Sequence, residues 1–310
     1  MMGQNSAIEW TDHTFSPWIG CTRVSDGCRN CYAERIAARF KLAQWGPHPR
    51  RPARPDAWEQ PIKWNDKAAR TGNRARVFCG SMMDVFDAHP DITPDTRRRL
   101  GITIDDTPHL LWLLLTKRPE NIPWLLPRMF PFGAPPNVRI GVSVEDQATA
   151  DERIPALLRH WEGQNFISYE PALGPVDFAR WLCEGWRGAL SSYFDRALGR
   201  RVADIDGLPV DGLDWVVAGA ESGPGARPAH PEWFRAARDQ CQAAGVPYFF
   251  KQWGEWAPDC LHRALSDRRE CKTTPRPAPG KMGVMFRCGK RNAGRLLDGR
   301  EWNEFPEDAQ

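Results

Sequence analysis

The segment Leu110–Lys117 (LLWLLLTK) is a run of six apolar residues that ends in a threonine and a lysine. A continuous apolar run of this length, in place of an alternating one, is typical of a strand that is buried on both faces of a parallel sheet. Similar short runs recur along the chain, separated by helical or loop patterns. They begin at Arg76, Val138, Asn165, Asp214 and Val246.

Helical patterns occupy the gaps between these runs. Residues 146–161 place Ile154, Leu157, Leu158 and Trp161 on one side, and residues 231–245 begin with a proline and end with a glycine. The repeated order of strand and helix predicts an α/β fold built on a parallel barrel or partial barrel, because a sandwich would lack the helices.

Length and charge limit the possible classes of function. The chain has 310 residues, enough for one large domain or two ordinary ones. Its formal net charge is only +3, which excludes bulk binding of a polyanion as the basis of function. The sequence has no apolar run long enough to span a membrane and its N-terminus lacks a secretory pattern, so we expect a cytoplasmic protein.

We place the barrel in residues 1–256, with an insertion at about 181–213, where aromatic residues lie among arginines and glycines. Residues 257–310 are expected to form an Arg-, Gly- and Pro-rich C-terminal extension that contains a β-hairpin-like stretch from Val284. Residues 45–56 are dense in proline and arginine and predict an exposed connection. Arg50, Arg51 and Arg54 could contact a phosphate backbone there, but a solvated loop is the favoured interpretation.

Three of the nine cysteines lie within eleven residues, at Cys21, Cys28 and Cys31. Turn-forming residues separate the first two, and a helical pattern begins directly after the third, so that backbone N–H groups at its start are expected to face the sulfurs. A chain of this length in a reducing compartment keeps its cysteines as thiols or metal ligands. Three thiolates suit a four-iron cluster that leaves one iron open to a small chelating ligand.

Other interpretations of this cluster stay open. The three cysteines could form a zinc site completed by His13 or Asp12, or a buried turn without metal. A second cluster on Cys260, Cys271 and Cys288 is disfavoured by the wide and irregular spacing of those cysteines.

Polar residues follow the apolar runs, at the strand ends where parallel barrels carry their chemistry. We expect these residues to line one mouth of the barrel. In chain order they are Ser81, Met82, Asp84, Thr116, Lys117, Arg118, Ser143, Glu145, Tyr169, Glu170, Glu221, Ser222, Lys251 and Gln252.

A three-cysteine loop that leads into a helix and then an α/β barrel resembles the radical S-adenosylmethionine superfamily. Within it, residues 8–34 look like the opening of the phage Gp37/Gp68 family, also called domain of unknown function 5131. Further stretches that resemble this family are residues 78–86, 115–119, 168–174, 219–228, 250–254 and 294–302. The cysteine spacing departs from the superfamily's usual one, with six and then two intervening residues in place of three and then two, and the aromatic Tyr32 follows the last cysteine.

The resemblance implies a radical enzyme. Cys21, Cys28 and Cys31 would hold a [4Fe-4S] cluster, and its open iron would bind S-adenosylmethionine, which the reduced cluster cleaves to a 5′-deoxyadenosyl radical. An electron donor such as a flavodoxin or ferredoxin would be needed, and the phage setting points to a nucleic acid or nucleotide substrate. The alternative is a zinc-stabilised nucleic-acid-binding or partner protein without radical chemistry.

The same resemblance assigns expected roles to the polar strand ends. The residues expected to bind S-adenosylmethionine are Gly80, Ser81, Met82, Ser143, Glu221 and Ser222. Glu145, Glu170 and Lys251 are expected to be catalytic, and Asp84, Lys117 and Arg118 are expected to hold the substrate.

Overall fold

The computed structural model describes residues 3–4, 6, 8–182, 194–195, 200–201, 212–258, 271–274 and 283–307. The chain divides into two compact units, which are described separately. Unit 1 comprises residues 1–142, 159–165 and 307–310, and unit 2 comprises residues 143–158 and 166–306.

The strands of unit 1 follow the order β1-β2-β5-β6-β7. They are β1 (Gly3–Gln4), β2 (His13–Phe15), β5 (Ala75–Cys79), β6 (Leu110–Thr116) and β7 (Val138–Val144). Only the pairing of β1 with β2 is antiparallel among these, since β2, β5, β6 and β7 run parallel to their neighbours. All seven residues of β7 are buried, as are all but one of β6, and this burial explains the apolar run of six residues in β6.

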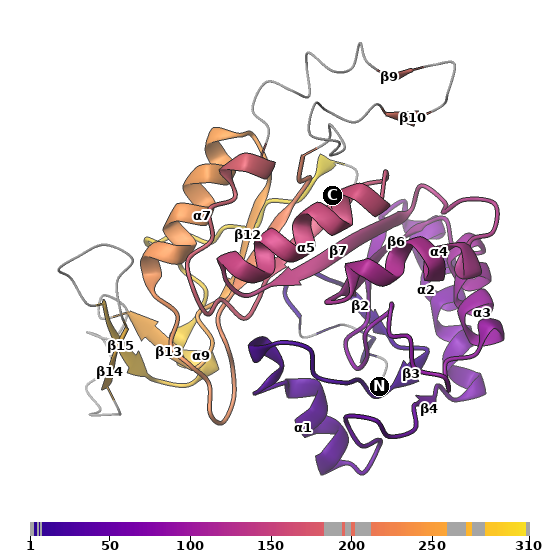
Figure 1. Ribbon diagram of the computed structural model, residues 1–310, viewed down its shortest axis with the longest axis horizontal. Coiled ribbons are helices and arrows are strands. Elements are labelled where there is room, and N and C mark those ends of the chain that lie inside the picture. The colour runs from indigo at the N-terminus through magenta and orange to yellow at the C-terminus, as the bar shows by residue number, and fades with distance from the viewer. Residues whose placement is uncertain are drawn as a thin grey trace. The chain divides into compact units, whose positions relative to one another are not determined.

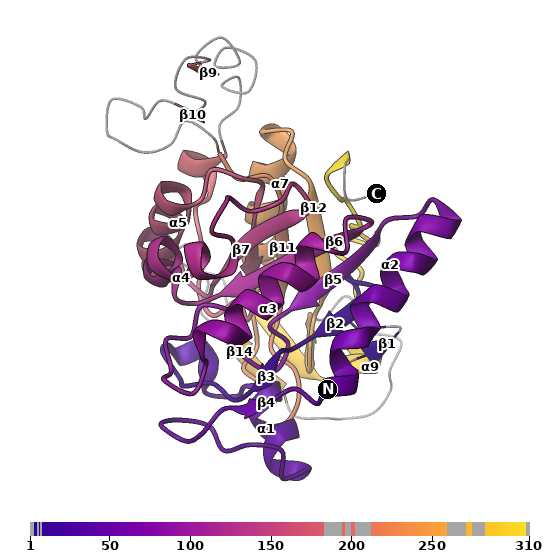
Figure 2. The ribbon, with the colours of Figure 1, turned by 90° about the vertical axis from the view of Figure 1, so that its right-hand side faces the viewer.

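Four helices belong to unit 1, and Figure 2 shows α2 and α3 lying along the strands β5 and β6. They are α1 (Tyr32–Arg39), α2 (Glu59–Thr71), α3 (Pro94–Asp105) and α4 (Ile122–Met129). Three short 3-10 turns accompany them, at Asp26–Cys28, Pro55–Trp58 and Pro119–Asn121, and β3 (Trp18–Ile19) pairs with β4 (Arg51–Pro52). The helix α3 begins after Thr93, whose hydroxyl caps the helix by accepting a hydrogen bond from the N–H of Thr96 at 3.2 Å.

Unit 2 carries three strands that run parallel, β8 (Asn165–Tyr169), β11 (Val216–Gly219) and β12 (Tyr248–Gln252). The helices are α5 (Gln147–His160) and α7 (Pro231–Ala243), with a 3-10 turn at Ala179–Trp181. In Figure 1 the orange helix α7 runs beside β12, and the Phe234 ring of α7 packs against Phe250 of β12 at 5.0 Å between centroids.

The predicted fold class is confirmed. The main sheet contains seven parallel strands, and helices alternate with them along the chain, as in an α/β fold. Among the described residues, no helix combines the length and the apolar character that crossing a membrane would require.

The C-terminal part of the chain adds a small antiparallel sheet with the order β13-β15-β14. Its members are β13 (Trp256–Pro258), β14 (Cys271–Thr274) and β15 (Gly283–Arg287), and the short helix α9 (Lys290–Ala293) follows. The stretch from Val284 that the sequence predicts as hairpin-like is the central strand of this sheet. Beyond it the chain returns to β12, since the N–H of Phe250 donates to the carbonyl of Trp302 at 2.9 Å.

The predicted insertion at 181–213 lies mostly outside the described residues. Within it the structure describes β9 (Phe194–Asp195) and β10 (Arg200–Arg201), which form an antiparallel pair. The predicted division between a barrel and an extension at residue 256 stays a prediction.

Candidate functional site

The three clustered cysteines lie on the loop that joins β3 to α1. Asp26–Cys28 form the predicted turn, and α1 begins at Tyr32, directly after Cys31, so the prediction for this segment is confirmed. Each cysteine is partly buried and none is in a disulfide. The loop therefore presents three thiols from one short segment.

Each sulfur of this loop has a nearby hydrogen-bonding group. The Cys28 sulfur lies 3.8 Å from the Ser25 hydroxyl. Burial raises the pKa of the Cys31 thiol, while the backbone N–H groups of Glu34 and Ala33 in the first turn of α1 act to lower it. These amides face the sulfur as the sequence predicts, and they are suited to stabilise a thiolate.

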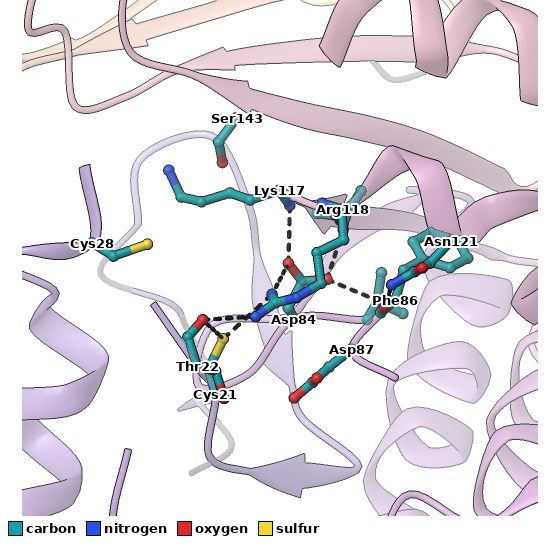
Figure 3. Close-up of polar contacts among 12 residues, drawn as sticks. Cys21, Thr22, Cys28, Asp84, Phe86, Asp87, Lys117, Arg118, Asn121 and Ser143 are labelled. Carbon is teal, nitrogen blue, oxygen red and sulfur yellow. Dashed lines mark hydrogen bonds and ion pairs between the residues drawn. The ribbon is translucent and has the colours of Figure 1, made fainter. Parts of the chain in front are cut away.

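The Cys21 sulfur faces an arginine from the end of β6 (Figure 3). Nη1 of Arg118 lies 3.7 Å from this sulfur, and Nη2 donates to the carbonyl of Thr22 at 2.6 Å. Burial raises the pKa of Cys21 to about 12, and the charge of Asp84 acts in the same direction, whereas Arg118 opposes both. Arg118 is thus the cation that favours a thiolate at Cys21.

Asp84 holds this arginine in place. Its Oδ2 accepts from Nη1 of Arg118 at 2.8 Å and from the N–H of Lys117 at 2.9 Å. Its Oδ1 accepts from the hydroxyl of Thr116 at 2.6 Å and from the N–H of Phe86 at 2.9 Å. A carboxylate has about four lone-pair sites, so these four donors use the hydrogen-bonding capacity of Asp84.

A second arginine, Arg50, holds the same loop. The prediction that Arg50 is solvated is wrong. Arg50 is only 5% exposed, because Nε donates to Oδ2 of Asp87 at 2.9 Å and Nη2 donates to the hydroxyl of Thr22 at 2.8 Å. Arg51 and Arg54 are exposed, as expected. A signal for Arg50 existed in the sequence, since Asp84 and Asp87 follow the same strand at a spacing of three and could each anchor an arginine.

The segment Gly80–Met82 also contacts the cysteine loop and α1. The hydroxyl of Tyr32 donates to the carbonyl of Ser81 at 2.8 Å, and the N–H of Gly20 donates to the carbonyl of Met82 at 3.1 Å. Met82 is buried in a small apolar cluster with Ala33 and Ala37 of α1. The structure therefore gathers Gly80–Met82, Asp84, Lys117, Arg118 and the three cysteines in unit 1.

The remaining predicted site residues belong to unit 2, where each acidic side chain is paired with a cation. Glu145 is 1% exposed, and its Oε1 lies 3.3 Å from Nη1 of Arg153, which also donates to the carbonyl of Ser143 at 2.8 Å. Glu221 accepts from Nε of Arg227 at 3.0 Å, and Ser222 follows it, partly buried. These arginines are further residues that sequence reasoning missed.

Glu170 and Lys251 form the third pair. Glu170 follows β8, and Lys251 lies in β12. Nζ of Lys251 is 2.7 Å from Oε1 and 2.9 Å from Oε2 of Glu170. Their side chains are only 19% and 11% exposed, so water screens the pair weakly. The structure thus brings together two of the three residues predicted to be catalytic, both in unit 2.

The proposed fourth zinc ligands have other partners. Oδ2 of Asp12 accepts from Nε of Arg76 at 3.0 Å, and the His13 ring stacks on Trp64 at 4.3 Å. In the part of the chain that the structure describes, no three His, Cys, Asp or Glu side chains are grouped so as to bind one metal ion. Cys260, part of the disfavoured second cluster, lies outside the described residues.

The donor set of the loop fits an iron-sulfur cluster better than a single ion. Each cysteine of a four-iron cluster binds a different iron, so the three sulfurs need not converge on one point. Three thiols on one loop, each with a hydrogen-bonding group beside it, are the type of ligand that such a cluster takes.

Comparison with known proteins gives a family but no curated relative, since no curated protein matches the chain. Two solved structures of spore photoproduct lyase, a cysteine-to-alanine mutant and a tyrosine-to-phenylalanine mutant, are each 14% identical to it. Their alignments cover 90% of this chain and 69% of the lyase chain, with TM-scores of 0.40 and 0.41. The family model described as protein of unknown function DUF5131 matches residues 5–306, and this chain therefore belongs to the DUF5131 family.

Proposed function

We propose that the protein binds a [4Fe-4S] cluster through Cys21, Cys28 and Cys31 and acts with S-adenosylmethionine as a radical enzyme. When bound, this cluster and cofactor would supply a 5′-deoxyadenosyl radical that abstracts hydrogen from a substrate. The observation that carries the proposal is that three thiols lie on one loop and that each sulfur has its own hydrogen-bonding group. Such groups stabilise the negative charge that cluster-bound thiolates carry.

The neighbourhood of the loop supports a cofactor site next to it. Gly80, Ser81 and Met82 follow β5 and contact the loop and α1 through backbone carbonyls, so they stand beside the proposed cluster. We propose that these residues, with Ser143, Glu221 and Ser222, bind S-adenosylmethionine.

Two further roles follow from the polar pairs. We propose that Glu145, Glu170 and Lys251 take part in catalysis, and that Lys117 binds the substrate. The contacts of Asp84 and Arg118 favour a role in holding the cysteine loop instead, because both side chains are buried and fully engaged there.

The setting of the reaction is part of the same proposal. We propose a cytoplasmic protein related to the phage Gp37/Gp68 family, reduced by a flavodoxin or ferredoxin and acting on a nucleic acid or nucleotide. Six described cysteines are free thiols, which suits a reducing compartment, and the exposed Arg51 and Arg54 are suited to contact a polyanion. We also propose that residues 1–256 form the catalytic barrel and that residues 257–310 extend it.

The test begins with anaerobic purification and reconstitution. Wild-type protein is expected to hold about four irons and four sulfides per chain, and to show the paramagnetic spectrum of a one-electron-reduced cluster after treatment with dithionite. Replacing Cys21, Cys28 or Cys31 by alanine is expected to abolish iron binding. The matched control is Cys241→Ala, which removes a buried thiol of α7 and should keep the iron content of wild type.

The second stage separates the cluster from the chemistry. Reduced protein is incubated with S-adenosylmethionine, and 5′-deoxyadenosine is measured by liquid chromatography and mass spectrometry. A cluster without any 5′-deoxyadenosine would refute the radical reaction and leave cluster binding intact. A colourless protein that holds one zinc would refute both and favour the zinc alternative.

A further inference from the structure

Two buried arginines clamp the first cysteine of the loop and its neighbour. Arg118 reaches the Cys21 sulfur and the Thr22 carbonyl, and Arg50 reaches the Thr22 hydroxyl. Each arginine is anchored by one carboxylate from the segment after β5, Arg118 by Asp84 and Arg50 by Asp87. The two arrangements differ in one respect, because Arg118 contacts a sulfur whereas the hydrogen bonds of Arg50 go to oxygen atoms.

Because Arg118 is buried, its charge acts strongly on the Cys21 sulfur. Arg118 and Asp84 are 8% and 5% exposed, so water does little to screen them. Nη1 of Arg118 is shared between Oδ2 of Asp84 at 2.8 Å and the Cys21 sulfur at 3.7 Å. Because its planar group also binds the Thr22 carbonyl, the guanidinium is fixed in orientation at the sulfur.

We propose that Arg118, oriented by Asp84, is a positioning residue that holds Cys21 as a cluster ligand and raises the reduction potential of the cluster. This inference rests on the proposed function. One-electron reduction of [4Fe-4S]²⁺ to [4Fe-4S]⁺ by an external low-potential reductant adds one negative charge to the cluster. A fixed cation at a ligand sulfur stabilises the reduced form more than the oxidised form, and hydrogen bonds to the sulfurs and local charge are known determinants of the potential.

The proposal predicts shifts of opposite sign for the two partners. Arg118→Gln removes the cation and is expected to shift the potential to more negative values. At the wild-type midpoint potential we expect the ratio of reduced to oxidised cluster to fall about tenfold, which corresponds to about 59 mV for one electron. Asp84→Asn removes the anion but retains one side-chain oxygen that can accept from the hydroxyl of Thr116 and the N–H of Phe86, which both donate to Oδ1 of Asp84. The potential is therefore expected to become more positive.

Arg50→Gln is the matched control. It removes a buried arginine that binds the same loop and is paired with an aspartate from the same segment, but its guanidinium acts on the Thr22 hydroxyl. We expect this variant to lower the thermal stability of the protein and to leave the cluster potential within about 10 mV of wild type, well below the tenfold shift of 59 mV.

The experiment is a redox titration of the reconstituted full chain with dithionite, followed by electron paramagnetic resonance. A negative shift for Arg118→Gln and a positive shift for Asp84→Asn support the proposal. Unchanged potentials, or shifts of the same sign in both variants, overturn it while the proposed function stands. If one of these variants does not fold, the sign of the shift in the other decides. Wild-type protein that holds no iron-sulfur cluster overturns both the inference and the proposed function.

Discussion

Replacing Gly254 by alanine should destabilise unit 2 far more than the same change at Gly245. Both glycines have a left-handed backbone, with φ of 72° and 64°. A β-carbon at Gly254 would lie 2.0 Å from the carbonyl oxygen of Glu221, whereas a β-carbon at Gly245 has no heavy atom within 4 Å. The pair of variants therefore separates the cost of the backbone conformation from the cost of the close approach.

The magnitudes follow from these contacts. Alanine in a left-handed conformation costs about 1 kcal/mol, and this is the loss of unfolding free energy that we expect for Gly245→Ala. At Gly254 the clash adds about 1–3 kcal/mol for overpacking. The displaced Glu221 carbonyl also weakens its hydrogen bond with the N–H of Glu255, which is 3.1 Å long and whose loss costs about 1 kcal/mol. We expect Gly254→Ala to lose about 3–5 kcal/mol in total.

The assay is urea unfolding followed by tryptophan fluorescence and circular dichroism, with wild type and both variants prepared in the same cluster-free state. Coincident transitions by the two probes justify a two-state comparison of free energies. Equal losses for the two variants would refute the reasoning, because the Gly254 backbone would then tolerate a β-carbon against Glu221. A larger loss at Gly245 would refute it as well.

Three further predictions concern unit 2. Hydrogen bonds from Arg235 lower the pKa of Asp298 below its ordinary value of 3.8, although burial opposes them, so Asp298→Asn should lose stability above about pH 4 relative to wild type. The difference in stability between wild type and Asp298→Asn should shrink as the pH falls through the folded-state pKa. Thermal melts at pH 7 and pH 3 measure it, and an equal difference at both pH values would contradict the prediction. Glu170→Gln and Lys251→Met should each lower the free energy of unfolding by about 3 kcal/mol, and the double variant should lose clearly less than the sum. A double-mutant cycle by urea unfolding measures this coupling, and simple additivity would show that the pair is uncoupled. Burial raises the pKa of Cys241, so iodoacetamide at pH 8 should label this thiol only in urea, and labelling of the native protein, read by mass spectrometry, would contradict the packing of α7.

Local patterns predicted much of this structure. The apolar run of β6, the start of α7 at its proline and the start of α1 after Cys31 each depend on residues that are neighbours in the sequence. A buried parallel strand is mainly apolar because helices or other strands cover both of its faces. The apolar run therefore predicts burial even when the covering elements are not known. The fold class followed from these elements.

The site was less predictable because its contacts join distant segments. Arg50 lies in a proline-rich stretch whose composition predicts exposure to solvent, and the carboxylate that pairs with it, Asp87, lies 37 positions later. The Glu221 pair spans six positions, yet it requires the loop after β11 to fold back on itself. The sequence next to an arginine does not show whether the side chain pairs with a buried carboxylate or faces water. Only the three-dimensional structure distinguishes the two cases.

The double arginine clamp on Thr22 bears on the order in which the protein matures. A short zinc knuckle acquires its shape from the metal, and its peptide is unstructured before the metal arrives. Here the loop at Cys21 is held by Arg50 and Arg118, and the N–H of Gly46 also donates to the Cys21 carbonyl at 2.8 Å. These contacts come from the polypeptide itself, so under the proposed function the first ligand would be held in place by protein contacts before a cluster binds.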